Sequence, residues 1–183
     1  LLDTARFDSG IVSLKLGDIC LQDLVRDVVA VQQPEAAAKN ISLTMVLTPT
    51  PLHVQADESR MRQVITNLIV NAIHYTPAGG RVTLSLELEE AAHQFAHLHV
   101  TDTGVGIRPE DISRIFEPFF RADQDSGVWQ GTGLGLPISR EIVELHGGSL
   151  TAESEVGVGS TFCVRLLLSS TNGESGDAGR VQP

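Results

Sequence analysis

Two glycine-rich turns, Asp102–Ile107 and Gly131–Leu136, constrain this chain more than any other feature of its sequence. A segment with two asparagines, Asn67–Asn71, precedes both turns and has a helical pattern. Glycine permits positive φ and lets the backbone approach a ligand closely. Free N–H groups at the start of a helix favour phosphate. In this order the three segments predict a pocket for a magnesium-bound nucleotide.

The pair of asparagines favours a ligand site on a helix. Residues 57–74 carry apolar side chains at helical spacing, and Asp57 is suited to cap the first turn. Asn67 and Asn71 are four residues apart, so both face the same way from this helix. A carboxamide oxygen is a hard, neutral ligand that suits Mg²⁺ otherwise held by phosphates and water. The helix alone is equally consistent with two asparagines on an exposed face.

The first glycine turn begins with a carboxylate. Asp102 ends a predicted strand and leads directly into Thr103–Gly106. A carboxylate at this position can accept a hydrogen bond from an exocyclic amine, which would distinguish adenine from guanine. Standing alone, the same motif would indicate only a capped strand followed by a turn.

The second glycine turn opens a predicted helix. Gly131–Gly135 lies where free N–H groups and the helix dipole favour phosphate. A glycine triplet of this kind is weak evidence by itself. The chain contains no Gly-x-x-x-x-Gly-Lys-[Ser/Thr] motif, which excludes the P-loop class.

Positive charge near these motifs is scarce. The two lysines of the chain, Lys15 and Lys39, both precede every motif. The negative charge of the phosphates would therefore have to be compensated by magnesium, backbone N–H groups, Arg121 or His74. Arg121 closes the aromatic segment Ile115–Arg121, where packing is the simpler interpretation for the phenylalanines and the arginine is a candidate phosphate or carboxylate contact.

Composition limits the partners and the compartment. The net charge of -10 argues against nucleic acid or an anionic membrane surface as the main partner. Cys20 and Cys163 have no metal or redox spacing, which favours a reducing compartment, and no apolar run reaches membrane-spanning length. We therefore expect a soluble cytoplasmic domain. The chain starts at Leu1 without a methionine, so we expect it to come from a larger protein, whose attachment to a membrane is left open.

The hydrophobic patterning predicts a layer of helices against a mixed sheet, not the regular alternation of a doubly wound fold. Strands 81–89 and 95–101 are expected to pair antiparallel, and the polar residues 121–132 predict a mobile loop. The expected helices cover 23–39 (with Pro34 as a kink or restart), 57–74, 109–116 and 133–146. The other expected strands cover 41–47, 52–55, and 149–155 with 160–168 as a closing hairpin.

Two histidines lie on one face of a predicted strand. His97 and His99 are two residues apart, so their side chains point the same way. No carboxylate or cysteine lies close to them along the sequence to complete a metal site. Two histidines on a solvated face are therefore the simpler interpretation.

Five segments, taken in order, resemble the boxes of sensor histidine kinases. Asn67–Thr76 resembles the N box, and Asp102–Gly106 resembles the G1 box. Ile115–Arg121 is similar to the F box, Gly131–Leu136 to the G2 box and Gly157–Phe162 to the last glycine box. The resemblance runs from about residue 20 to residue 168 and is highly specific because all five boxes are present.

This resemblance implies an α/β two-layer sandwich (α+β), in which a mixed, mostly antiparallel sheet packs on helices and ATP lies between helices and a lid. It implies that Asn71 is the magnesium ligand, Asn67 a partner on the phosphate side and Asp102 the adenine contact. The implied catalytic residues are Asn67, Asn71 and Arg121. The remaining implied ATP-binding residues are His74, Tyr75, Gly104, Gly106, Ile107, Phe119, Gly131, Thr132, Gly133, Leu134, Gly135, Leu136 and Thr161.

The resemblance also implies a division of the chain and a set of partners. Residues 1–20 are similar to the end of a dimerisation and phosphoacceptor hairpin with its linker, and residues 21–168 to the catalytic ATP-binding domain. Residues 169–183 have the composition of a disordered tail or linker. The acceptor histidine is absent, since the first histidine is His53. The implied cofactors are ATP and Mg²⁺. The implied partners are the phosphoacceptor histidine domain of a homodimeric parent kinase and a response regulator receiver domain.

Two positions bear on the type of reaction. The family commonly has lysine where this chain has His74, and a neutral imidazole compensates less phosphate charge. Related ATP hydrolases place a glutamate four residues before the magnesium asparagine, whereas this chain has Asn67, which cannot act as a base at neutral pH. Phosphoryl transfer to a histidine is thus favoured over activation of water. The alternative is a degenerate module that binds nucleotide, or nothing, and signals by conformation, for which His74 is the main support.

Overall fold

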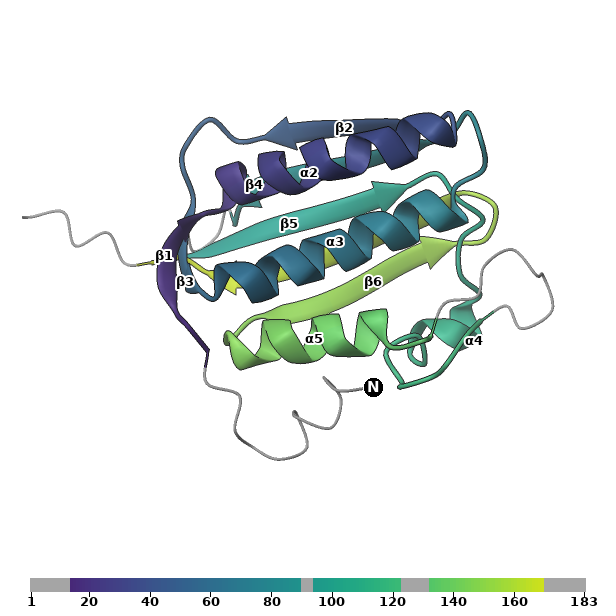
Figure 1. Cartoon of the computed structure of the whole chain (residues 1–183). Helices are drawn as coiled ribbons and strands as arrows, with labels where there is room; N and C mark the ends of the chain where they lie inside the picture. The colour runs from purple at the N-terminus through teal and green to yellow at the C-terminus, as the bar shows by residue number, and fades with distance from the viewer. Residues whose placement is uncertain (1–13, 90–93, 123–131, 170–183) are drawn as a thin grey trace, which may run out of the picture.

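Helices cover one face of a sheet in the computed structural model, which describes residues 14–89, 94–122 and 132–169. Three helices, α2 (Leu21–Ala38), α3 (Glu58–Tyr75) and α5 (Gly135–Leu145), lie side by side over the sheet, with α3 in the middle (Figure 1). This arrangement confirms the predicted two-layer sandwich.

The main sheet has five strands in the order β2-β4-β5-β7-β6. β2 pairs parallel with β4, and the other three pairs are antiparallel, so the sheet is mixed and mostly antiparallel as expected. The predicted antiparallel pair β4–β5 and the closing hairpin β6–β7 are both confirmed. The strands are β2 (Ser42–Leu47), β4 (Arg81–Leu88), β5 (Phe95–Asp102), β7 (Gly159–Leu167) and β6 (Ser149–Glu155).

A second, two-stranded sheet was only half predicted. β3 (His53–Ala56) matches an expected strand, but β1 (Gly17–Cys20), its antiparallel partner, falls in the segment expected to be a linker. Four residues are too few to show a strand period, and β1 is held by backbone pairing with no fully buried side chain. The division of the chain at residue 20 stays a prediction because residues 1–13 lie outside the described ranges, as do residues 170–183.

The helix expected over 23–39 is present as α2 and continues through Pro34, since the backbone N–H of Lys39 donates to the Glu35 carbonyl at 3.2 Å. Two element boundaries differ from expectation. α4 (Pro109–Ile112) is shorter than predicted, because the following backbone forms successive tight turns that bond i to i−3. α5 begins at Gly135 and not at residue 133. Of the predicted mobile loop, residues 123–131 lie outside the described part. Within the described part, no helix is long and apolar enough to cross a membrane.

α3 carries the centre of the core. One stripe of this helix is buried against the sheet and the neighbouring helices, and the two predicted asparagines lie beside that stripe and not in it. On the sheet, the inward side chains alternate with outward ones, as in Leu84, Leu98 and Val164. The buried stripe of α3 consists of Met61, Val64, Ile65, Leu68, Ile69, Ala72 and Ile73.

Asp57 caps α3, as predicted from the sequence. Its Oδ1 accepts hydrogen bonds from the Arg60 backbone N–H at 3.2 Å and from the Ser59 hydroxyl at 2.6 Å, and its Oδ2 accepts from the Lys15 backbone N–H at 3.0 Å. Led by the Ser59 bond and opposed by burial, these bonds lower the pKa of Asp57 to about 2. The Asp57 backbone N–H donates to Nε2 of His146, which ties the start of α3 to the end of α5.

We expect Asp57→Ala to lower the free energy of unfolding by about 1–2 kcal/mol, because the first turn of α3 loses its capping oxygen. Asp57→Asn, which keeps a capping oxygen, should cost less. The folded state lowers the pKa of Asp57 from 3.8 to about 2. The advantage of the carboxylate is therefore present above about pH 4 and lost as the pH falls through 2. Urea unfolding of the three proteins across this range measures both effects. Equal stability of all three at pH 7 would contradict the capping role.

Candidate functional site

A cavity of about 350 Å³ lies between α3, the first turn of α5 and the ends of β5 and β7. Its wall is mainly apolar, and among the described residues Asp102 and Arg121 are the only charged side chains in it. Such a wall suits a flat organic ring held by a few polar anchors. Of the predicted site residues, the cavity brings together Asn67, Asn71, Tyr75, Asp102, Gly106, Ile107, Arg121, Thr132, Gly133, Gly135 and Leu136.

α3 presents its two asparagines to this cavity. Nδ2 of Asn67 lies 3.4 Å from the carbonyl oxygen of Gly135 and 3.3 Å from Oγ of Ser139, so it links α3 to α5. The Asn71 side chain also lines the cavity but makes no hydrogen bond to a residue in the described ranges. The whole carboxamide of Asn71 is thus available to a ligand, whereas Asn67 already uses its Nδ2 to contact α5.

Asp102 is buried at the end of β5, with 5% of its surface exposed. Its Oδ1 accepts hydrogen bonds from the backbone N–H groups of Gly104 at 2.8 Å and Ser160 at 3.3 Å. Burial raises the pKa of Asp102, and the two backbone bonds oppose that shift. Both bonds end on Oδ1, so Oδ2 is the oxygen left to accept a hydrogen bond from a ligand in the cavity.

The first glycine turn is closely packed against two neighbouring segments. A Cβ on Gly104 would lie 2.5 Å from the carbonyl oxygen of Tyr75 and 2.6 Å from Oδ1 of Asp102. Gly106 has φ +72°, and a Cβ there would collide with the carbonyl group of Glu155. Gly106 lines the cavity, whereas Gly104 is not in its wall and instead lets the turn pack closely on the last residue of α3, Tyr75. Only glycine fits either position without a shift of backbone.

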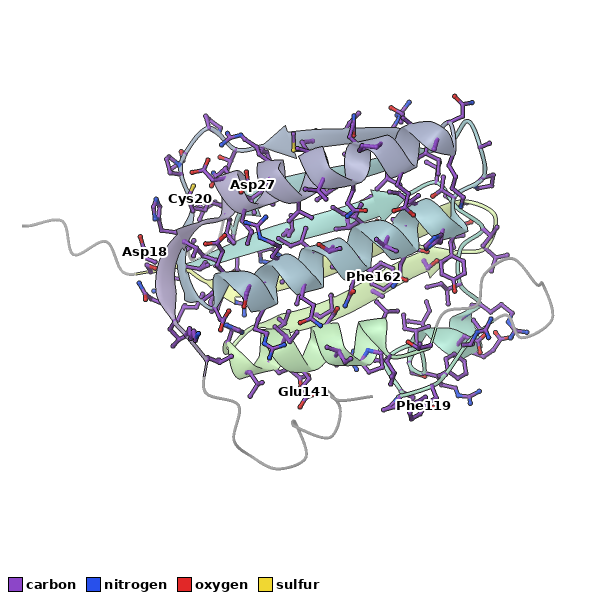
Figure 2. All side chains as sticks on the ribbon, in the orientation of Figure 1. Asp18, Cys20, Asp27, Phe119, Glu141 and Phe162 are labelled. Atoms are coloured by element: carbon purple, nitrogen blue, oxygen red, sulfur yellow. The ribbon has the colours of Figure 1, made fainter. Side chains whose placement is uncertain are left out.

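The second glycine turn packs against the segment that follows α4. The Phe119 backbone N–H donates to the Gly133 carbonyl at 3.0 Å, and a Cβ on Gly133, whose φ is +69°, would lie 2.8 Å from the Phe119 carbonyl carbon. Phe119 itself is 68% exposed and lies at the outer edge of the molecule near α4 (Figure 2). Phe120 lines the cavity instead, with the Arg114 guanidinium 4.3 Å from its ring centroid.

His74 does not lie in the cavity wall. Its Nε2 is 3.5 Å from Oε1 of Glu35 on α2, and burial lowers its pKa, with the charge of Glu35 acting against that shift. Lys39 is also held away, because its Nζ donates to the carbonyl oxygens of Ile73 at 2.9 Å and His74 at 3.0 Å. Of the candidate cations named from the sequence, only Arg121 reaches the cavity.

The strand alternation of β7 also separates predicted residues from the site. Thr161 faces outward and its Oγ1 lies 3.0 Å from Oγ1 of Thr101, whereas Ser160 and Phe162 line the cavity. Leu134 precedes the first turn of α5 and is not in the wall either. Gly131, implied by the resemblance, lies outside the described residues.

Several lining residues were not predicted from the sequence. Phe162 reaches from the sheet toward the space beside α3 (Figure 2), and the period of two in β7 would have found it together with Ser160. The other lining residues reach the cavity only through the tertiary fold, and their local sequence pattern does not distinguish them from core residues. These other lining residues are Val70, Ala72, Val105, Ile115, Phe120, Ala122 and Pro137.

Comparison with known proteins places the same segment in a described family. Residues 56–170 match the family described as histidine kinase-, DNA gyrase B-, and HSP90-like ATPase. Sensor histidine kinase RppB of Synechocystis sp. is 43% identical over 152 residues, which cover 82% of this chain and 33% of that protein. The chain therefore spans about a third of the length of this curated relative.

Two solved structures resemble the fold. Full-length ShkA, in complex with AMPPNP, has a TM-score of 0.76 and 30% sequence identity, and the match covers 86% of this chain and 32% of that chain. Histidine kinase ThkA, in complex with the response regulator protein TrrA, has a TM-score of 0.74 and 26% identity. That match covers 92% of this chain and 46% of the ThkA chain.

The crowding at Gly106 can be separated from its positive φ. Gly157 has a similar φ of +80°, but nothing lies within 4 Å of a Cβ built there. We expect Gly157→Ala to cost about 1–3 kcal/mol of stability, the cost of backbone strain. Gly106→Ala should cost more, because it also forces the turn away from Glu155. Chemical denaturation of the two variants measures the difference. Equal losses would mean that the turn relaxes freely around a methyl group.

Proposed function

The chain belongs to the histidine kinase-, DNA gyrase B- and HSP90-like ATPase family, and we propose that it is the catalytic ATP-binding domain of a sensor histidine kinase. In this proposal it binds Mg-ATP and donates the γ-phosphoryl group to a histidine outside the chain. The observation that carries the proposal is the cavity itself. It joins one buried carboxylate, an available carboxamide and two glycine turns in a mainly apolar wall.

We assign Asp102 as the residue that hydrogen-bonds the adenine base of ATP. Oδ2 of this carboxylate is not used by the two backbone donors, which both reach Oδ1. An adenine amine would donate to Oδ2, whereas guanine presents a carbonyl oxygen at the corresponding position, which would face a carboxylate oxygen without a hydrogen bond. Apolar neighbours such as Ile107 and Phe162 supply flat contact surface for the ring.

The donor set near α3 fits a magnesium ion that is bound mainly through phosphates. Asn71 lines the cavity with a carboxamide that has no hydrogen bond among the described residues, and an oxygen ligand of this kind is one that Mg²⁺ accepts. When bound, the ion would supply charge neutralisation at the phosphate oxygens. Asn67 is assigned to hold α3 against α5 through Gly135 and Ser139, so its part is to position Asn71.

Protein groups for the phosphates lie on the other side of the cavity. Arg121 is the cationic side chain in the described part of the wall. Thr132, Gly133 and Gly135 line the cavity where α5 begins, and the N–H groups at the start of a helix favour phosphate oxygens. Because His74 faces Glu35, we assign the protein's positive charge toward phosphate to Arg121 and not to His74.

Transfer to a histidine is favoured over hydrolysis of ATP. Activation of water requires a base, and Asp102 is the only carboxylate that lines the described part of the cavity. Asp102 is assigned to the base of the nucleotide, and the position four residues before Asn71 is an asparagine engaged with α5. Positioning and charge neutralisation of the triphosphate then suffice for phosphoryl transfer to an incoming imidazole.

The partners follow from the same proposal. The acceptor histidine and the response regulator would belong to other segments or proteins, because this chain covers about a third of RppB. The ThkA structure with TrrA supports a response regulator as a partner, and the ShkA structure with AMPPNP supports ATP as the ligand. A homodimeric parent with a phosphoacceptor hairpin remains part of the proposal.

The second candidate is a degenerate module without kinase activity, and the replacement of the usual lysine by His74 favours it. Calorimetric titration with ADP and AMPPNP, with and without Mg²⁺, separates the two candidates. Binding tighter than ~1 mM that requires Mg²⁺ for the triphosphate supports the kinase domain. Phosphotransfer to an added phosphoacceptor domain then tests the reaction. Absence of binding by either nucleotide would favour the degenerate module.

We expect Asp102→Asn to weaken ATP binding by about 10- to 100-fold, the effect of losing a hydrogen bond to a charged group. Oδ1 of the asparagine can still accept from Gly104 and Ser160, so the fold should be retained. Its Nδ2 would face the adenine amine, donor against donor. Binding of GTP, measured in parallel by calorimetry, should change far less. Equal losses for both nucleotides would refute the adenine contact.

We expect Asn71→Ala to abolish the Mg²⁺ dependence of AMPPNP binding without unfolding the domain, because Asn71 is half-buried and outside the core stripe. Gln63→Ala is the matched control, since Gln63 lies on the same helix and outside the cavity. Titrations of both variants with and without Mg²⁺, together with their thermal melts, make the test. An unchanged Mg²⁺ effect in Asn71→Ala would remove this residue from the metal site.

A further inference from the structure

The face of the sheet that points away from the helices carries a cluster of two histidines and a cysteine. His97 and His99 lie on β5, and Cys163 lies on β7 directly opposite His99 in the antiparallel register. The sequence alone disfavoured a metal site at the histidines because no cysteine lies near them along the chain. The pairing of β5 with β7 supplies that cysteine from a distant segment.

The ligand atoms of the three side chains are already close together. One nitrogen from each histidine and Sγ of Cys163 lie within 4.8 Å of one another. Sγ is 3.5 Å from Nδ1 of His97. In a tetrahedral zinc site, bonds of about 2.3 Å to sulfur and about 2.0–2.1 Å to nitrogen place these two ligand atoms roughly 3.6 Å apart. The His97–Cys163 distance therefore needs little change to accept a metal ion.

We propose that His97, His99 and Cys163 form a site for one Zn²⁺ ion on the outer face of the sheet, separate from the nucleotide cavity. A mixed nitrogen and sulfur donor set selects Zn²⁺ over hard cations such as Mg²⁺ and Ca²⁺, which take oxygen ligands. Three protein ligands leave the fourth tetrahedral position to water or an added ligand.

A second layer of contacts supports the orientation of His97. Its Nε2 is buried, makes no hydrogen bond within the described ranges and lies 4.0 Å from Oε2 of Glu89. The same Glu89 oxygen accepts a hydrogen bond from Arg165 at 3.1 Å. Metal-bound histidines commonly direct their other ring N–H at a carboxylate, and here Nδ1 would bind the ion while Nε2–H points toward Glu89. With Nδ1 bound to the ion, the proton of His97 would sit on Nε2, the nitrogen that faces the Glu89 carboxylate.

Cys163 is half-buried on β7 and offers its Sγ to the same space as the two imidazoles. The metal ligand is the thiolate, so binding of Zn²⁺ must displace the thiol proton.

The site is independent of the nucleotide cavity by geometry. Along β5 the side chains of Leu98, Val100 and Asp102 point toward the helices, while His97 and His99 point the other way. The same alternation on β7 sends Phe162 inward and Cys163 outward. Occupancy of one site therefore does not require occupancy of the other, and the proposal does not rest on the proposed kinase function.

The test is titration of the metal-free, reduced and untagged chain with Zn²⁺ and with Co²⁺ in the absence of nucleotide. Calorimetry should give one Zn²⁺ per chain, and Co²⁺ should produce thiolate-to-cobalt charge-transfer absorption. Zn²⁺ should also raise the melting temperature, because only the folded chain brings β5 and β7 together. Absence of Zn²⁺ binding would overturn the proposal, as would a cobalt spectrum without a thiolate band.

Variants assign the ligands. Cys163→Ser should remove the thiolate band. Loss of a residue that only contacts a metal ligand lowers metal affinity by about 10- to 100-fold, and Glu89→Gln should lower Zn²⁺ affinity within this range. Cys163→Ser and His99→Gln each remove a ligand and should lower Zn²⁺ affinity by more. Cys20→Ser removes the other cysteine and should change nothing, and Asn71→Ala should likewise leave Zn²⁺ binding intact. Retention of the band in Cys163→Ser, or its loss in Cys20→Ser, would overturn the assignment.

Discussion

The packing of α3 across the sheet is the constraint on which both the core and the candidate site depend. Its apolar stripe, including Val64, Leu68 and Ile69, is almost completely buried. A rotation of the helix by one residue would expose these side chains and bury a carboxamide, and each unpaired amide in an apolar interior costs roughly 1–3 kcal/mol. Burial of the stripe therefore fixes the direction in which Asn67 and Asn71 point. The ligand face of α3 is a consequence of core packing and needs no separate device.

Asp102 has a similar double role at the opposite wall. Its Oδ1 joins the start of the first glycine turn to the start of β7 through the N–H groups of Gly104 and Ser160. These bonds hold a buried carboxylate in place while leaving Oδ2 uncommitted. The two glycine turns are then fixed by close backbone approach, Gly106 to Glu155 and Gly133 to Phe119. Contacts within the protein therefore already hold Asp102 and both glycine turns in place, so a ligand would meet a preorganised wall.

Local periodicity predicted most of the fold, and tertiary register decided what it could not predict. The helix at 57–74 and its cap at Asp57 follow from spacing and one side chain, and both are confirmed. β1 has four residues, too few to show the alternation of apolar and polar side chains that identifies a strand. His74 lies one helical turn from Asn71, so spacing alone could not tell whether it faces the cavity or Glu35 on α2. That choice depends on the position of α2, which no local pattern encodes.

β5 and β7 show why a single pairing can serve two unrelated chemistries. Because side chains alternate along a strand, Asp102 faces the cavity, while His99, three positions earlier, faces outward. On β7 the outward neighbour of the cavity residue Phe162 is Cys163, which the register sets against His99. A shift of either strand's register by one residue would disrupt both the cavity wall and the cluster of His97, His99 and Cys163. The hydrophobic core between the helices and the sheet resists such a slip, so the burial that keeps Asp102 in the cavity also keeps the thiol against the imidazoles.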